Sequence, residues 1–184
     1  MQKIVEVPID RLQGLLKGFN VQTAVQVPGG SFDGWSLWQC DVHMTSGYVW
    51  QAVYAGPNET ECWSYLCWRN VDICGVTYRE GVGQFTEAGH ARKGLASAVL
   101  EAALNFNLPL LSDREGLTFQ AFRLWHKRAR KGGAAVLDLS TGERHSVNDF
   151  KWHELWNDEP GSEKLQLVFD SPALPSVGTA PADE

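Results

Sequence analysis

The sequence predicts an α+β domain, in which helices and a mixed, mostly antiparallel sheet form three α/β/α layers. Residues 35–86 are rich in aromatic and β-branched residues and are divided by turn signals, which favours an antiparallel meander. Two amphipathic helical patterns follow, at 92–105 and 116–133. A short apolar stretch at 108–113 lies between them and is expected to be a buried strand.

The first third of the chain is expected to begin with a short edge strand at 3–8 (KIVEVP). A proline at its end suits the start of a helix, which we predict over 9–19. Four apolar residues would share one face of that helix: Ile9, Leu12, Leu15 and Leu16. The glycine- and proline-rich stretch 26–34 (QVPGGSFDG) predicts a loop.

The aromatic region is expected to hold three to five antiparallel strands. Its strand-like segments are 35–44, 47–55, 61–68 and 71–79, and 83–90 is a candidate for a last strand.

Beyond the meander, the first helix repeats Leu95, Val99, Ala102 and Phe106 at helical spacing. The second helix ends in four cations and two glycines, as helix C-termini favour. A hairpin at 134–147, a short helix at 148–156 and a strand at 164–170 complete a single domain over 1–170. The tail 171–184 is proline, alanine and acid, and we expect it to be disordered.

Composition is ordinary for a globular protein: 184 residues, 43% of them hydrophobic. The N-terminus lacks the apolar core of a signal peptide, and no apolar run approaches the roughly 20 residues that span a bilayer. We therefore expect a cytoplasmic protein with free, buried thiols. The spacing of the four cysteines, Cys40, Cys62, Cys67 and Cys74, is not that of a metal site, and we expect no metal.

Charge is distributed unevenly along the chain. Residues 90–131 hold eight Lys or Arg and three acidic residues, a net +5, which leaves −11 for the rest of a chain whose total is −6. A basic segment in an acidic chain indicates an anionic ligand or partner, although a solvated helix face would look the same. The acidic total argues against broad nucleic-acid binding.

The stretch 88–96 (AGHARKGLA) places histidine, two cations and a glycine directly before the first helix. A helix N-terminus exposes unpaired N–H groups and partial positive charge, which suits a phosphate. Gly94 would let a ligand approach the backbone, and Arg92 and Lys93 add charge. Neither GxxxxGK[ST] nor GxGxxG is present, and the short cradle suits a pyrophosphate presented end-on.

This segment resembles the acyl-CoA pyrophosphate loop of the GCN5-related N-acetyltransferases, Q/R-x-x-G-x-G/A. Gly94 and Ala96 match the small residues, whereas Ala91 stands where the family usually has Gln or Arg. The family's N-x-x-A-x-x-x-Y-x-K is similar to Thr118, Ala121, Trp125 and Lys127, at the same spacing. The similarity covers about 80–140, and small acetyltransferase-like proteins of tailed phages share the arrangement around 110–127.

The resemblance implies a fold in which two adjacent parallel strands splay and receive the pantetheine arm. It places the pyrophosphate, and with it acetyl-CoA as co-substrate, on seven residues: His90, Ala91, Arg92, Lys93, Gly94, Leu95 and Ala96. Thr118 would lie near the pantetheine or the adenosine. Glu80 and Glu87 are the candidate bases, and Trp125 stands where relatives often have a tyrosine that protonates the thiolate.

Three functions are consistent with these observations. The first is an acyl-CoA-dependent N-acyltransferase that acts on an amine, either a protein lysine or a small molecule. The second is a binding protein that kept the scaffold without catalysis, such as a virion component or host-directed factor of a tailed phage, with a protein partner. A nucleic-acid contact through the basic face 123–131 is a third reading, which steep salt dependence would mark.

Overall fold

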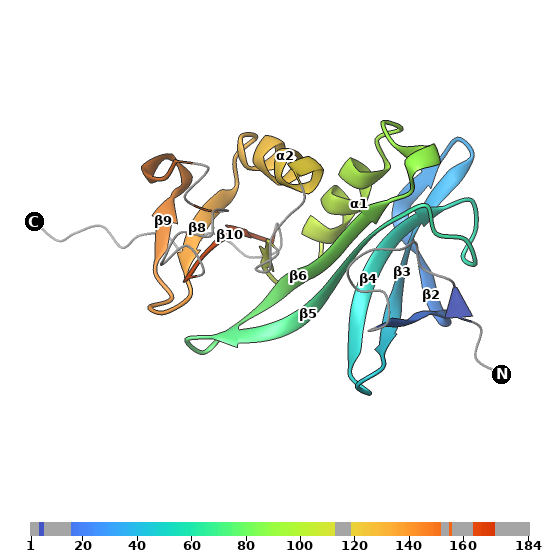
Figure 1. Ribbon diagram of the computed structural model, residues 1–184, viewed down its shortest axis with the longest axis horizontal. Helices are drawn as coiled ribbons and strands as arrows, with labels where there is room; N and C mark the ends of the chain where they lie inside the picture. The colour runs from blue at the N-terminus through green and yellow to red at the C-terminus, as the bar shows by residue number, and fades with distance from the viewer. Residues whose placement is uncertain (1–3, 6–15, 113–118, 152–154, 156–163, 172–184) are drawn as a thin grey trace, which may run out of the picture.

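The computed structural model describes residues 4–5, 16–112, 119–151, 155 and 164–171. These residues form a ten-stranded sheet in the order β1-β2-β3-β4-β5-β6-β7-β10-β8-β9 (Figure 1). Neighbouring strands are antiparallel except for β6 and β7, which run parallel. The prediction of an α+β domain around a mixed, mostly antiparallel sheet is therefore confirmed.

The meander is the first half of this sheet. Its strands are β3 (Trp35–Met44), β4 (Val49–Gly56), β5 (Ser64–Ile73) and β6 (Val76–Thr86). The predicted edge strand at 3–8 is also present, as β1 (Ile4–Val5), paired with the next strand. Side chains alternate between the two faces of these strands, and each face carries its own apolar cluster.

The prediction for residues 16–32 was wrong. Residues Leu16–Phe32 form one long strand, β2, so the end of the helix predicted at 9–19 and most of the loop predicted at 26–34 are strand. Residues 9–15 lie outside the described part. Three register shifts against β3 absorb the irregular stretch that contains Pro28 and two glycines. Bulges of this kind let a strand near the sheet edge carry residues that would break a regular ladder.

Two further boundaries differ from the prediction. The segment 71–79 is not one strand, because a tight turn at Cys74 and Gly75, both at positive φ (51° and 79°), separates β5 from β6. Two positive-φ residues are what a two-residue hairpin turn requires. The predicted last strand at 83–90 is not separate either, since its first four residues belong to β6.

Both predicted helices are present. They are α1 (Leu95–Leu104), which starts three residues later than expected, and α2 (Phe119–Ala129), and β7 (Leu110–Leu111) lies between them in the chain as a buried strand. Residues of α1 and α2 join one apolar cluster on one face of the sheet (Figure 1). Within the described residues the helices cover that face alone, so the three-layer arrangement is not shown. None of the described helices is long and apolar enough to cross a membrane.

The C-terminal strands complete the sheet beyond β7. The predicted hairpin is present as β8 (Ala134–Asp138) and β9 (Arg144–Ser146), and the closing strand as β10 (Leu165–Phe169), between β7 and β8. Where the short helix was predicted at 148–156, the first two residues belong to a 3₁₀ turn at Val147–Asp149; residues 152–154 and 156 lie outside the described part. Of the predicted tail, only Ser171 is described, and it is buried.

Arg79 on β6 fastens α1 to the sheet. Its guanidinium is buried and donates hydrogen bonds to the carbonyl oxygens of Ala103, Phe106 and Leu108, at and beyond the C-terminal end of α1. It also lies 5.3 Å from the ring centres of Trp68 and Phe106. A cation at this end of a helix is favoured by the helix dipole. Burial lowers the pKa of the guanidinium to about 10, so it stays charged at neutral pH.

We expect Arg79→Leu to lower the free energy of unfolding by about 3 kcal/mol, because buried carbonyl oxygens lose their donors. Urea unfolding followed by circular dichroism measures it. Arg130→Leu is the control, because it makes the same substitution at an exposed arginine. It should change the free energy of unfolding by less than about 0.5 kcal/mol. Equal stability of the two variants would contradict the anchoring role.

The four cysteines are free thiols, and three of them are buried. Burial raises the pKa of Cys40 to about 12 and that of Cys62 well above its usual value. Because the thiolate is the reactive form, these thiols should be inert in the folded protein.

A thiol reagent such as 5,5′-dithiobis(2-nitrobenzoate) should therefore label one cysteine rapidly at pH 7.5, and the other three only after unfolding. The rapid phase belongs to Cys74, which is exposed, and Cys74→Ser should abolish it. Rapid labelling of a second thiol in the folded protein would show that the apolar cluster around Cys40 and Cys62 opens.

Candidate functional site

The parallel strands β6 and β7 stay together over a short distance only. Their ladder joins Arg79 with Leu110 and Glu80 with Leu111. Leu110 and Leu111 also pair with β10, and Ser112 continues that contact: its N–H donates to the Leu167 carbonyl oxygen over 2.9 Å and its hydroxyl accepts from the Leu167 N–H over 3.2 Å. Within the described residues, the carboxyl half of β6 has no ladder with β7.

A β-bulge marks the point of separation. On β5, Cys67 pairs with Gly83 and the next residue, Trp68, pairs with Gly81, so Val82 is the extra residue on β6. An extra residue reverses the face to which later side chains point. Glu80, before the bulge, lies on the face opposite the helices, whereas Gln84, after it, faces them.

Gln84 meets the second helix. Its Oε1 accepts a hydrogen bond of 3.1 Å from the indole Nε1 of Trp125 on α2. Trp125 is fully buried and packs against Phe169 of β10, with 5.5 Å between ring centres. The structure thus brings the predicted Trp125 to the carboxyl half of β6, as an anchored side chain.

The turn between β6 and α1 changes direction twice in the left-handed region. Arg92 has φ 65° and Gly94, the N-cap of α1, has φ 82°. A Cβ built on Gly94 would meet nothing within 4 Å, so the space in front of this residue is open. The first turn of α1 has no acidic residue and no side-chain cap in the part of the chain described, which leaves its N–H groups available to an anion.

The turn is fastened to the β4–β5 connection. The Glu87 N–H donates to the carbonyl oxygen of Trp63 over 2.9 Å, and the ring of His90 stacks on that of Trp63 with centres 4.0 Å apart. His90 also lies 3.2 Å from the Lys93 ammonium through Nδ1 and 3.6 Å from the Glu87 carboxylate through Nε2. His90 is therefore held in place beside the predicted phosphate cradle.

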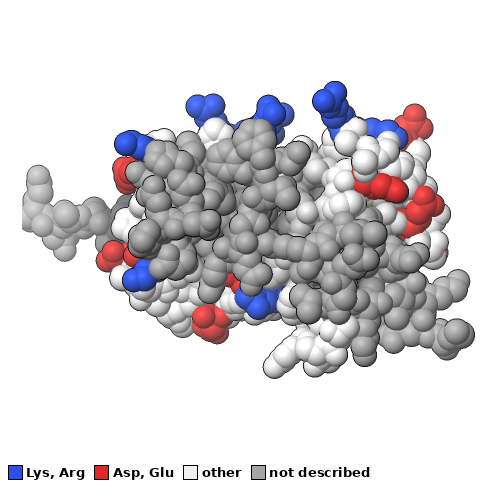
Figure 2. Space-filling view, viewed as in Figure 1, with Lys and Arg blue, Asp and Glu red and all other residues white. Residues whose placement is uncertain are grey.

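Part of the basic segment is used inside the structure. Arg128 and Lys131 form ion pairs with Glu101 of α1 at 3.1 and 3.8 Å, which join α2 to α1. Arg92 and Lys93 are exposed in the turn. Figure 2 shows lysine and arginine along the edge of the molecule where Figure 1 draws α2 and the turn before α1. Positive charge thus lies on the same edge as the uncapped helix start.

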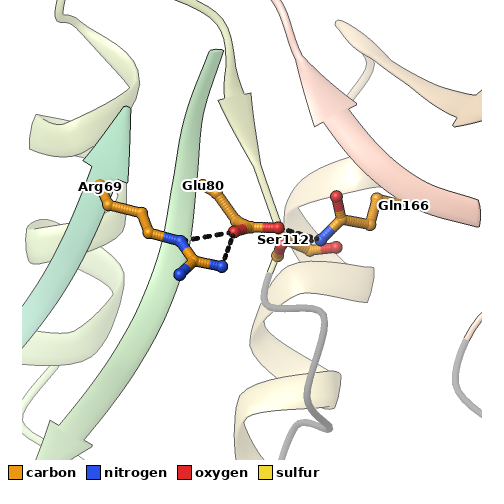
Figure 3. A network of polar contacts seen from close by, with 4 residues as sticks. All are labelled: Arg69, Glu80, Ser112 and Gln166. Atoms are coloured by element: carbon orange, nitrogen blue, oxygen red, sulfur yellow. Dashed lines mark hydrogen bonds and ion pairs between the residues drawn. The ribbon is translucent and has the colours of Figure 1, made fainter. Parts of the chain in front are cut away.

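The two candidate bases differ in burial and in hydrogen-bond partners. Glu80 is buried, and its Oε2 accepts from Nε and Nη2 of Arg69 at 2.9 and 2.7 Å (Figure 3). Its Oε1 accepts from Gln166, which also donates to the carbonyl oxygen of Ser112. Glu87 is half exposed in the turn and pairs with His90. Glu80 therefore belongs to the β6–β7–β10 junction, and Glu87 to the cradle.

The remaining predicted residues divide as follows. Ala91 and Gly94 are exposed, Ala96 is half-buried and Leu95 is buried in the helix-side core, so only its backbone N–H can serve a ligand. Thr118 lies outside the described residues. Sequence reasoning missed Gln84 and Trp63. The signal that could have found Gln84 is the pair Gly81 and Gly83, because glycine inside a strand pattern indicates a bulge, and a bulge there turns Gln84 toward α2.

The described residues hold no group of three or more His, Cys, Asp or Glu side chains that could bind a metal ion.

Comparisons with known proteins do not assign the chain to a family. No family model matches the chain, and no curated protein matches it. Among solved structures, a match is the GCN5-related glucosamine N-acetyltransferase region of a fungal multi-domain GH3 beta-N-acetylglucosaminidase, with 10% identity and a TM-score of 0.31. The match covers 57% of this chain and 14% of that chain. At these values the likeness does not place the chain in that family.

Arg92→Gly should raise the free energy of unfolding by up to about 1 kcal/mol, because glycine adopts positive φ without the clash that a side chain meets. Lys93→Gly is the matched control: it removes a neighbouring exposed cation at a residue without positive φ, and should not stabilise. Thermal unfolding of both variants measures the effect. Equal shifts of the unfolding temperature in the two variants would show that Arg92 carries no backbone strain.

Proposed function

We propose that the protein is an acyl-CoA-dependent N-acyltransferase that uses acetyl-CoA as acyl donor. The observation that carries the proposal is the separation of β6 from β7 directly after Glu80 and Leu111, on a strand that leads into the uncapped start of α1. The sequence resemblance implies splayed parallel strands and a phosphate-binding turn, and this separation supports the proposal.

In this proposal the pyrophosphate binds the backbone of the turn from His90 to Ala96. The α1 N–H groups and the charges of Arg92 and Lys93 favour an anion there. The open space in front of Gly94 supports this placement, since a ligand could reach the backbone at that point. The pantetheine arm then runs along the carboxyl half of β6, which has no ladder with β7 within the described residues.

The reaction is direct attack by a neutral amine on the thioester carbonyl carbon. A C–N bond forms and the C–S bond breaks, which yields an amide and free CoA. The amine's surplus proton passes to a base, and the departing sulfur takes one proton. We assign the base to Glu80, acting through water, because it lies where β6 and β7 separate and on the face away from the helices. Glu87 is the alternative base.

Trp125 cannot take the tyrosine's part as an acid, because an indole N–H is a donor only. A thiol has an ordinary pKa of about 8.5, so solvent can protonate the leaving sulfur. The acceptor is a primary amine, either a protein lysine or a small molecule, and the cytoplasm supplies both.

A binding protein without catalysis is the second candidate. The contact between Trp125 and Gln84 favours it, because these side chains occupy space between α2 and β6 on the helix side of the sheet. Such a protein would bind a protein partner rather than acyl-CoA. We propose this alternative as a virion component or a host-directed factor of a tailed phage.

Titration calorimetry with acetyl-CoA and with free CoA tests the first proposal. We expect micromolar affinity in the wild type and a loss of at least about 100-fold in Gly94→Glu, because a carboxylate would repel the phosphates. Gly94→Ala is the matched control, since it carries the same positive-φ strain without the charge and should bind within about fivefold of the wild type.

Absence of binding to the wild type at millimolar acetyl-CoA would reject the enzyme and favour the binding protein. Equal losses in Gly94→Ala and Gly94→Glu would show that backbone strain, and not a phosphate, explains the effect.

A further inference from the structure

Gln84 carries a buried hydrogen-bond donor that is not used. Its Nε2 is inaccessible to solvent and has no hydrogen-bond partner among the described residues, while its Oε1 accepts from Trp125. Buried polar groups are nearly always paired, so an unpaired amide inside a protein calls for an explanation. A ligand that brings an acceptor atom would supply the partner.

The orientation of this amide is set by its neighbour. The two ends of a glutamine amide look alike in shape, but the indole Nε1 can only donate. The end that faces Trp125 must therefore be the oxygen, and Nε2 must point away from the indole. A flip of the amide would set two donors against each other, so Trp125 holds the Nε2 donor in one direction.

The position of Gln84 identifies the kind of ligand. It lies after the bulge, on the helix-facing side of the part of β6 for which the described residues show no ladder with β7. Two residues further along, Thr86 already bonds to Ser64, whose hydroxyl also donates to the Phe85 carbonyl oxygen. Gln84 is thus an unpaired donor between the strand separation and the phosphate-binding turn, where an extended arm with carbonyl oxygens would run.

We infer that the Gln84 Nε2 donates a hydrogen bond to a carbonyl oxygen of the acyl-pantetheine arm, and that Trp125 is a positioning residue that aims it. The inference rests on the proposed function. The carbonyl belongs either to a pantetheine amide or to the thioester, and both are neutral acceptors of the same chemistry. Relatives often have a tyrosine at this motif position that donates a proton. In this inference the Trp125 indole instead orients the Gln84 amide.

Gln84→Glu is the decisive variant. A glutamate at this position still accepts from Trp125 but has no N–H, so the change removes the donor and keeps the anchor. Its affinity is measured by calorimetry for acetyl-CoA, for free CoA and for adenosine 3′,5′-bisphosphate, which has phosphates and no pantetheine. Gln51→Glu, at an exposed position on β4, is the control for added charge.

We expect Gln84→Glu to weaken acetyl-CoA binding by about tenfold or more and to leave the bisphosphate within about twofold. An equal loss for free CoA assigns the pantetheine amide, and a loss for acetyl-CoA alone assigns the thioester. Trp125→Phe should weaken the same ligands less, because the donor remains but is no longer aimed. It should spare the bisphosphate, which damage to the fold would not do.

The inference is overturned if Gln84→Glu binds acetyl-CoA as the wild type does, or if all three ligands weaken together. If Gln84→Glu binds acetyl-CoA as the wild type does, the proposed function is unaffected. That proposal is tested separately, by binding of acetyl-CoA to the wild type and by its loss in Gly94→Glu. Failure of the wild type to bind acetyl-CoA at all rejects the proposed function and this inference together.

Discussion

The bulge at Val82 is the constraint on which the arrangement of this molecule depends. It divides β6 into two halves with opposite facing. The amino half is paired on both sides, with β5 and with β7, and the carboxyl half is paired with β5. The extra residue interrupts the regular ladder with β5. Side chains after it therefore point to the opposite face from the one they would take in an unbroken strand. The consequence is that Glu80 and Gln84, which would share a face in a regular strand, lie on opposite faces.

Two adjacent charged residues hold the amino half in place. Arg79 points to the helix side and bonds to carbonyl oxygens at the end of α1, and Glu80 points to the other side and pairs with Arg69 and Gln166. Buried charges are costly unless they are fully bonded, so each one specifies its partners closely. Together they fix α1 and β10 against β6, and the start of α1 is thereby held at the end of the strand that leads to it.

Much of the fold could be predicted from the sequence, because its signals are local. The aromatic meander, the α1 pattern from Leu95 to Phe106 and the hairpin at 134–147 each depend on residues near one another in the chain. The long strand β2 could not be predicted, since residues 16–19 were expected to end a helix and the Pro28 region fits a loop. Pairing of Leu16–Phe32 with β3 overrides both. The phosphate cradle stays a prediction from its glycine and cations, whereas the facing of Gln84 depends on a bulge that Gly81 and Gly83 only suggest and that the pairing with β5 fixes.

Under the proposed function, the tryptophan at position 125, where the family it resembles often has tyrosine, would have a physical meaning beyond the absence of an acid. A tyrosine hydroxyl can both donate and accept, so it would leave the Gln84 amide free to take either orientation. An indole permits one orientation, and its larger ring fills the core against Phe169 as well. Under the proposed function, tryptophan at this position would therefore supply no acid, which a leaving thiol of ordinary pKa does not require, and would instead fix the orientation of the Gln84 donor. A site built in this way would favour binding of the arm over speed of the chemical step, because a bond formed equally before and during reaction lowers the free energy of both states.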